Sequence, residues 1–206
     1  QLYSTASYVN RDLTGINLSF NNLSAWYFTS QNLGSSNLTN ADLEHIRDAK
    51  SPEFRSKTLD ITFPAAAGAK GLEDSLARLR RETEQAINDG YAVIILSDRG
   101  VSAERAPIPA LLAVSAVHQH KVSLGTSSQA SLVLESGEPR EVMHYALLVG
   151  YGCGAINPYL ATEVIMRMHE EARFPAEMSV HDAIEHYNKS IEAGLLKIFS
   201  KMGIST

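Results

Sequence analysis

Short apolar runs alternate with longer helical patterns from residue 59 onward, and this alternation most constrains the fold. Four runs are predicted as strands: Leu59–Phe63, Tyr91–Leu96, Ala130–Leu134 and the short Ala155–Ile156. Tyr91–Leu96 is uniformly apolar, as buried parallel strands are. Helical periodicity follows each of them, over residues 71–89, 108–120, 140–151 and 159–171. Uniformly apolar strands separated by helices are typical of βα units. The sequence therefore predicts an α/β fold with a parallel sheet of about four strands, half-barrel-like or a small open sheet. A pair of helices, 180–194 and 195–202, is expected at the end.

Residues 11–43 follow a different rule, because an apolar residue recurs there at every fifth position. The recurring residues are Leu13, Leu18, Leu23, Phe28, Leu33, Leu38 and Leu43. A period of five fits neither a helix nor a strand, and a short fixed period indicates a solenoid whose turns stack on one another. The alternative is an Asn- and Ser-rich loop with periodic leucines. A charged connector over residues 44–57, with Pro52 as a breaker, separates this stretch from the α/β part.

This five-residue pattern resembles the pentapeptide-repeat family, in which a central leucine or phenylalanine follows Asp or Asn. The resemblance implies a short β-helix with these residues pointing inward. The position two before the centre, usually small in that family, holds Arg11, Ile16, Trp26 and Gln31, so the repeat is degraded. The chain then divides into a repeat-like segment over 1–43, the connector over 44–57, and a partial α/β domain over 58–206.

Composition excludes several classes of function. The formal net charge is −5 and no tract is rich in Lys or Arg, which argues against a nucleic-acid partner. No apolar run approaches the roughly 18 residues that a membrane span needs, so a cytoplasmic protein is expected. The single cysteine, Cys153, cannot form an internal disulfide or hold an iron–sulfur cluster alone. Because the chain begins at Gln1 rather than Met, we expect a processed, trimmed or excised polypeptide.

Polar and charged residues collect where the predicted strands end, which is where open α/β sheets bind ligands. Candidate ligand or interface contacts are Asp98, Arg99, Glu135, Ser136, Arg140, His144, Asn157 and, near the end of the chain, Lys201. Glu135, Arg140 and His144 could converge as an acid–base cluster with an anion-binding arginine. The alternative is that these groups hold strand-to-helix corners by hydrogen bonds and ion pairs. Lys201 could approach a phosphate beside a glycine and serines, or lie in a frayed end.

Three histidines, His118, His120 and His144, raise the question of a metal site. His118 and His120 alternate on a predicted helix, so their rings diverge, whereas zinc needs three or four converging ligands. We therefore expect no metal site.

Six segments, in order, are similar to the central domain of glutamate synthase, both the bacterial large subunit and the ferredoxin-dependent type. They are FRSKTLDITFP (54–64), YAVIILSDRG (91–100), APIPALLAVSAVHQH (106–120), LVLESGEPREVMHYALLVGYG (132–152), INPYLATE (156–163) and GLLKIFSKMGIST (194–206). LTNADLEHIRD (38–48) is also similar, so the resemblance covers residues 38–206.

The resemblance implies a part of an enzyme that makes glutamate from glutamine and 2-oxoglutarate in nitrogen assimilation. In that family an amidotransferase domain releases ammonia, and a flavin domain with FMN and an iron–sulfur cluster reduces the imine. The central domain connects the two, in the cytoplasm or, for plant-type relatives, in plastids. We therefore expect no catalytic residue and no cofactor in this chain, and the amidotransferase and FMN-binding domains, or self-association, as partners.

Three other hypotheses remain open from the residues alone. The first is a small α/β enzyme that uses the cluster between Glu135 and His144. The second is a binding or structural module led by the repeat-like segment, and the third is a fusion fragment without activity.

Overall fold

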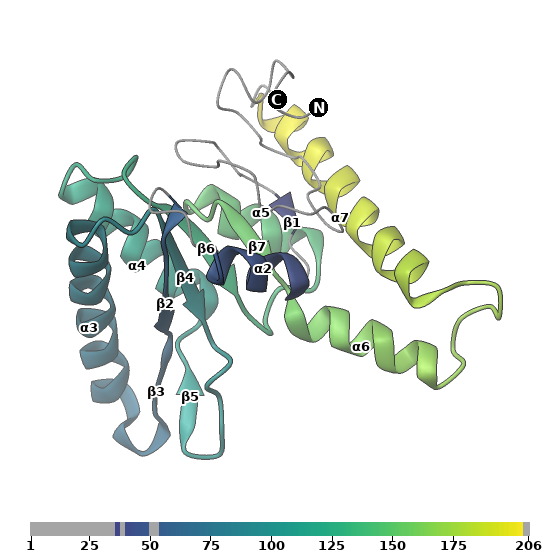
Figure 1. The fold of residues 1–206 in the computed structure, drawn as a ribbon, viewed down its shortest axis with the longest axis horizontal. Coiled ribbons are helices and arrows are strands. Elements are labelled where there is room, and N and C mark those ends of the chain that lie inside the picture. The colour runs from purple at the N-terminus through teal and green to yellow at the C-terminus, as the bar shows by residue number, and fades with distance from the viewer. Residues whose placement is uncertain (1–35, 38–39, 50–53, 204–206) are drawn as a thin grey trace.

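Four parallel strands form the centre of the computed structural model, which describes residues 36–37, 40–49 and 54–203 (Figure 1). They are β2 (Ser56–Asp60), β4 (Val93–Ser97), β6 (Ser131–Glu135) and β7 (Ala155–Asn157), and they lie side by side in this order. The two-residue strand β1 (Ser36–Asn37) pairs with β7 in parallel at the outer edge. The order in space follows the order in the chain, as in half of a βα barrel. The predicted α/β fold and parallel sheet are confirmed.

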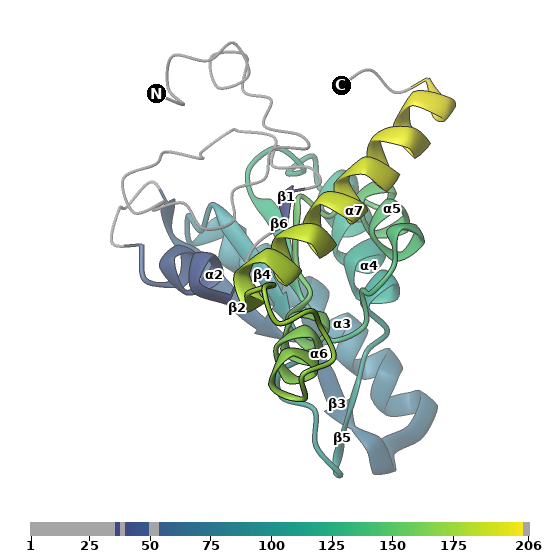
Figure 2. The ribbon, with the colours of Figure 1, turned by 90° about the vertical axis from the view of Figure 1, so that its right-hand side faces the viewer.

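The helices cover the two faces of the sheet unequally. The helices are α2 (Asn40–Arg47), α3 (Gly68–Asn88), α4 (Ala110–Ser123), α5 (Val142–Gly150), α6 (Tyr159–Glu170) and α7 (Val180–Met202). Figures 1 and 2 show α3, α4 and α5 on one face and α2 on the other. The helices α3 to α6 begin and end within a few residues of the predicted bounds.

Alternate strand residues explain these two layers, because successive side chains of a strand point to opposite faces. Ile94, Leu96, Leu132 and Leu134 belong to the main apolar core, together with residues of α3, α4, α5 and α7. Val93, Ile95 and Val133 are buried as well but lie outside that cluster. They lie on the face that α2 covers, where Leu43 and Ile46 of α2 are also buried. The central residues of β4 and β6 are therefore uniformly apolar because both faces of the sheet are covered there.

The first predicted strand, Leu59–Phe63, is wrong as a single element. After β2 the chain turns, and β3 (Thr62–Pro64) pairs antiparallel with β5 (Arg105–Pro107), a strand the sequence did not predict. The carboxylate of Asp60 makes the turn by accepting hydrogen bonds from the Thr62 backbone N–H at 2.8 Å and hydroxyl at 2.7 Å. Arg105 then bonds to Asp60 Oδ2 and Thr62 Oγ1, each at 2.7 Å. A 3-10 turn, η3 (Ala65–Ala67), leads into α3.

The predicted terminal pair of helices is also wrong, since α7 is one continuous helix. Gly194 does not interrupt it; the glycine allows a close approach, because a Cβ there would lie 2.5 Å from Val142 Cγ2 on α5. The Ser179 hydroxyl accepts a hydrogen bond from Asp182 N at 3.1 Å and begins the helix. Gly203, with φ +72°, ends it.

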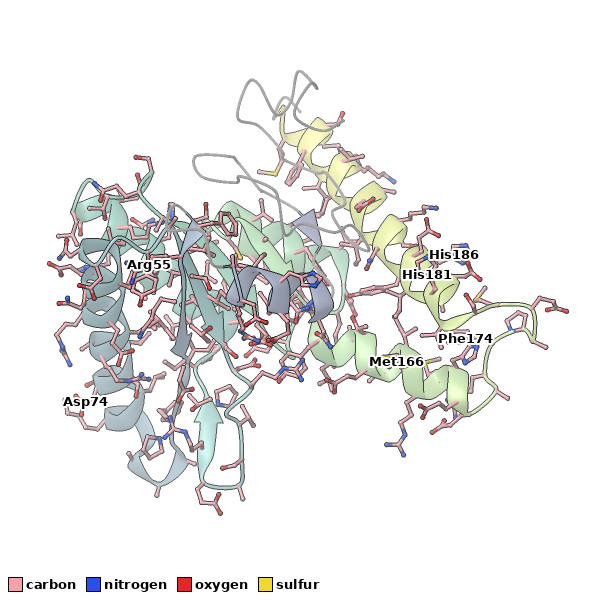
Figure 3. All side chains as sticks on the ribbon, in the orientation of Figure 1. Arg55, Asp74, Met166, Phe174, His181 and His186 are labelled. Carbon is pink, nitrogen blue, oxygen red and sulfur yellow. The ribbon has the colours of Figure 1, made fainter. Side chains whose placement is uncertain are left out.

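The helix α6 and the first part of α7 extend beyond the end of the sheet as an arm (Figure 1). Figure 3 shows Met166, Phe174, His181 and His186 on this arm, away from the strands. The second part of α7 returns to the body, where Ile191, Leu195 and Phe199 join the main core.

The stretch that precedes the sheet differs from its predicted form where it is described. Residues 41–45, the last of the five-residue repeats, lie in the helix α2, so this unit is not a β-helix coil. The earlier units lie outside the described residues, apart from Ser36–Asn37 in β1 and Asn40, the first residue of α2. The residues expected as a connector include the end of α2 and the start of β2. Among the described residues, no helix is long and apolar enough to cross a membrane.

Candidate functional site

The four parallel strands all end in polar residues at one register, and we call these four residues the polar row. Asp60 is paired with Ser97, Ser97 with Glu135, and Glu135 with Asn157. Residues paired in register on parallel strands project from the same face of a sheet. The polar row therefore lies at the carboxyl edge, the side on which α/β proteins hold ligands.

Glu135 is the buried charge at the centre of the polar row, with 2% of its surface exposed. Its Oε2 accepts hydrogen bonds from the Ser97 hydroxyl and from the guanidinium of Arg47 on α2. Its Oε1 accepts from Arg99 Nε at 3.1 Å. Burial raises the pKa of Glu135, but the hydrogen bonds from Ser97 and Arg47 and the Arg47 charge outweigh it, so the pKa lies below its ordinary value. The carboxylate therefore stays ionised and held from three sides.

Arg99 joins three separate elements through one guanidinium. Besides Glu135, it contacts Glu163 of α6 through Nη1 at 2.9 Å and Asn40 of α2 through Nη2 at 3.3 Å. The ring of Tyr159 lies 3.8 Å from the guanidinium carbon, a cation–π contact. Burial lowers the pKa of Arg99, but the bonds to Glu163 and Glu135 more than reverse this. Arg99 thus links α2, β6 and the first turn of α6.

Asn157 links the last strand to α2 and to the neighbouring loop. Its side-chain amide donates to Asn40 Oδ1 at 3.1 Å. Its backbone carbonyl accepts from the Ser136 N–H at 3.1 Å. Both contacts hold the carboxyl end of β7 against the elements beside it.

Asp98 and Ser136 lock together the loops that follow β4 and β6. The Ser136 hydroxyl donates to Asp98 Oδ2 at 2.6 Å, and the Gly137 N–H donates to the same oxygen at 3.1 Å. Both side chains are buried. Tyr159 lies beside them: burial first, and then its hydrogen bond with Asp98, raise the pKa of its hydroxyl far above the ordinary value. The raised pKa keeps the Tyr159 hydroxyl protonated near neutral pH.

Five of the eight predicted site residues therefore come together, and three do not. Asp98, Arg99, Glu135, Ser136 and Asn157 form one network at the carboxyl edge. Arg140 and His144 instead line a cavity between α4 and α5, which Glu135 does not line. Lys201 is exposed in the last turn of α7. The acid–base convergence of Glu135, Arg140 and His144 is not formed, because Glu135 points to the face that α2 covers.

The sequence did not single out four members of this network: Asn40, Arg47, Tyr159 and Glu163. Tyr159 and Glu163 lie one helical turn apart directly after the Asn157-Pro158 corner, and that spacing could have drawn attention to them. Asn40 and Arg47 gave no such signal, since they lie far away in the chain and within the stretch interpreted as repeats and connector.

Cys153 is the one cysteine of the chain, and it lies away from the polar row. The Cys153 thiol is buried and donates to the Ala155 carbonyl at 3.1 Å. Burial raises its pKa to about 12, so it is a neutral thiol and a poor nucleophile. In the described part of the chain, no three His, Cys, Asp or Glu residues are placed to hold a metal ion.

Comparison with known proteins identifies the family. Residues 21–206 match the family model described as the glutamate synthase central domain. The chain belongs to this family. The match begins inside the five-residue repeats, earlier than residue 38, where the resemblance was expected to start. Part of the repeat-like stretch therefore belongs to the glutamate synthase central domain.

Individual relatives agree with this assignment. The NADPH glutamate synthase large chain of Bacillus subtilis is 40% identical over 169 residues, which are 82% of this chain and 11% of that protein. The NADH glutamate synthase of Saccharomyces cerevisiae is 38% identical, covering 77% of this chain and 8% of that protein. The ferredoxin-dependent glutamate synthase of Pyropia yezoensis is 37% identical, covering 82% and 11%. The chain thus spans about a tenth of the length of these curated relatives.

The comparison with solved structures adds no functional argument. A putative fructose-1,6-biphosphate aldolase from Coccidioides immitis covers 88% of this chain and 86% of its own, with a TM-score of 0.34 and 12% identity.

Proposed function

We propose that this chain is the connecting domain of a glutamate synthase and catalyses no reaction by itself. In this proposal the amidotransferase domain releases ammonia from glutamine, and a flavin domain uses it with 2-oxoglutarate to make glutamate. The present domain fixes the position of the other two. FMN and the iron–sulfur cluster belong to the flavin domain, and this chain supplies no ligand to either.

The observation that carries the proposal is the state of Glu135. A general acid or base needs a proton that exchanges near the working pH, and it must reach the substrate. Glu135 is buried, ionised, and bonded to Ser97, Arg47 and Arg99. The place where an α/β enzyme holds its reacting groups is thus occupied by a closed set of ion pairs.

The same network is suited to holding separate helices and strands at fixed positions. The network joins α2, which precedes β2 in the chain, to the sheet and to α6, which projects from the sheet. A domain that positions two others needs elements held at fixed angles, and buried, fully bonded charges restrict such angles more than apolar packing alone. The polar row serves this purpose in the proposal.

The test is reconstitution from three separately produced parts: this chain, an amidotransferase domain and a flavin domain. We expect the chain alone to bind no FMN, seen as the lack of a flavin absorbance band, and to form no glutamate. Glutamine-dependent glutamate formation should appear only when all three parts are mixed. Two results would contradict the proposal: glutamate formation by the chain alone, or equal formation by the other two parts without it.

A further inference from the structure

A cavity of about 320 Å³ lies between the start of α4 and the first turns of α5. Its walls include three leucines and three groups with polar ends: Leu111, Leu147, Leu148, Glu138, Arg140 and His144. None of these residues belongs to the polar row, and the contact with its network is made by the Glu138 backbone N–H, which donates to Ser136 Oγ at 3.1 Å. The volume is at the lower end of the range for small-molecule sites, about 300–1,000 Å³.

Each of the three polar groups retains unused bonding capacity among the described residues. Arg140 is exposed, and its guanidinium makes no hydrogen bond or ion pair there. Glu138 accepts a bond from the Ala110 N–H through Oε2 at 3.1 Å, which leaves Oε1 available. Glu138 and Arg140 do not pair with each other, so Glu138 Oε1 and the Arg140 guanidinium are both available to a ligand.

The hydrogen bonds of the His144 ring fix which of its two nitrogens carries the proton. Its Nδ1 accepts hydrogen bonds from the backbone N–H groups of Arg140 and Glu141, at 3.2 Å and 3.4 Å. The neutral ring therefore carries its proton on Nε2. Within the described residues Nε2–H has no acceptor, so it remains available to a ligand.

These features together select a class of ligand. A simple anion would meet the carboxylate of Glu138, and a simple cation would meet Arg140, so neither matches the lining. A zwitterion matches both, because it offers an ammonium to Glu138 and a carboxylate to Arg140. The leucines form an apolar wall beside them.

We infer that this cavity binds a free α-amino acid with an apolar side chain. The ligand carboxylate bonds to Arg140 and to Nε2–H of His144, the ammonium bonds to Glu138, and the side chain packs on Leu111, Leu147 and Leu148. This inference does not depend on the proposed function, since the cavity is formed within this chain.

The first test is calorimetric titration of the full chain with L-leucine and two analogues. We expect saturable binding of L-leucine with a dissociation constant of about 1 mM or tighter. Loss of a charge-assisted hydrogen bond weakens binding roughly tenfold or more. 4-Methylpentanoate, which lacks the ammonium, and 3-methylbutylamine, which lacks the carboxylate, should each be weaker by that factor. Equal affinity of either analogue, or no binding of leucine at millimolar concentration, overturns the inference.

Variants test the assignment of residues. Arg140→Gln should weaken leucine binding roughly tenfold or more, while Arg81→Gln should leave it unchanged. Arg81 is an exposed arginine on α3 that lines none of the cavities described. Because Arg140 is exposed, its replacement should leave the melting temperature unchanged, and circular dichroism verifies that the variant is folded. Equal binding by wild type and Arg140→Gln would contradict the placement of the carboxylate.

Discussion

The helices α4 and α6 both follow a parallel strand, yet different forces hold them. Six of the fourteen residues of α4 are buried, and Ala113, Val114 and Val117 belong to the main core. None of the twelve residues of α6 is buried. Its first turn is fixed instead by the Arg99–Glu163 ion pair and by the stacking of Tyr159 on Arg99. The same βα connection can thus end in a helix held by apolar burial or in one held by polar contacts at its start.

This difference reflects what each helix faces. The helix α4 packs between α3 and α5 on the face of the sheet opposite α2, so apolar residues are needed on most of its surface. The helix α6 projects beyond the sheet and contacts α7, and it leaves Leu160, Val164 and Met166 exposed. Burial of apolar area cannot orient such a helix strongly, because the stabilisation scales with the area removed from water.

The largest effect should come from truncating the core beside α4. Leu134 is fully buried in β6, and Leu134→Ala should lower the free energy of unfolding by about 4 kcal/mol. Val164→Ala on α6 is the matched control, and because Val164 is half exposed it should cost less than about 0.5 kcal/mol. Urea denaturation measures both. Similar losses in the two variants would remove the distinction between the helices.

The next effect should come from the buried charge of the polar row. Glu135→Gln keeps the shape of the side chain but removes the charge that Arg47 and Arg99 share. We expect a loss of about 3 kcal/mol, since breaking a buried ion pair leaves its partners uncompensated. Glu170→Gln, at an exposed position of α6, should change the unfolding free energy by less than about 0.5 kcal/mol. Equal stability of Glu135→Gln and wild type would show that the network contributes nothing.

The positions of most strands and helices could be predicted from the sequence because they depend on local hydrophobic periodicity. Leu132 and Leu134 alternate with Val133, and all three are apolar because both faces of the sheet are covered. The pair β3 and β5 was missed because each is three residues long and contains a proline. The continuity of α7 was missed because Gly194 resembles a helix end in the sequence, whereas its role is close packing on Val142.

The candidate site was only half predictable for a related reason. Glu135, Asp98 and Asn157 follow apolar strands directly, so their position at the carboxyl edge is encoded locally. Arg47 reaches Glu135 across 88 positions of the chain, and no local pattern reports such a contact. Arg140 and His144 lie close to Glu135 in sequence, but the corner after β6 sends them to the opposite layer.

A third prediction concerns the one buried charged residue of α4. Lys121 donates a hydrogen bond to the Ala130 carbonyl, and burial lowers its pKa from 10.5 to about 8. Between these two pH values the unfolded chain binds a proton that the folded chain does not, so this lysine's contribution to stability rises with pH. The rise should reach about 2–3 kcal/mol. Unfolding curves of wild type and Lys121→Met are compared from about pH 7 to 11.5, roughly one unit beyond the window on each side. They should converge or cross; parallel curves would contradict the assignment.

The smallest effect should be a local one at α6. Arg99→Met removes the contact to Glu163 at the start of this helix together with those to Glu135 and Asn40. It should cost about 1 kcal/mol globally, because Arg47 and Ser97 still hold Glu135. Amide hydrogen exchange in the first turns of α6 should accelerate about tenfold, with no change in α4. Arg167→Met, which removes only an exposed pair with Glu171, should leave the exchange unaltered. Faster exchange in α4 as well would show that the two helices are not held independently.

The central claim is that the polar row fastens elements together and does not carry out a reaction. A double-mutant cycle of Arg99→Met and Glu135→Gln, measured by urea denaturation, tests it most directly. We predict that both single changes destabilise the chain and that their coupling energy is about 0.5–1 kcal/mol. Residues kept for catalysis often lower stability, so their replacement stabilises the fold. A more stable Glu135→Gln variant, or strictly additive effects, would contradict the account.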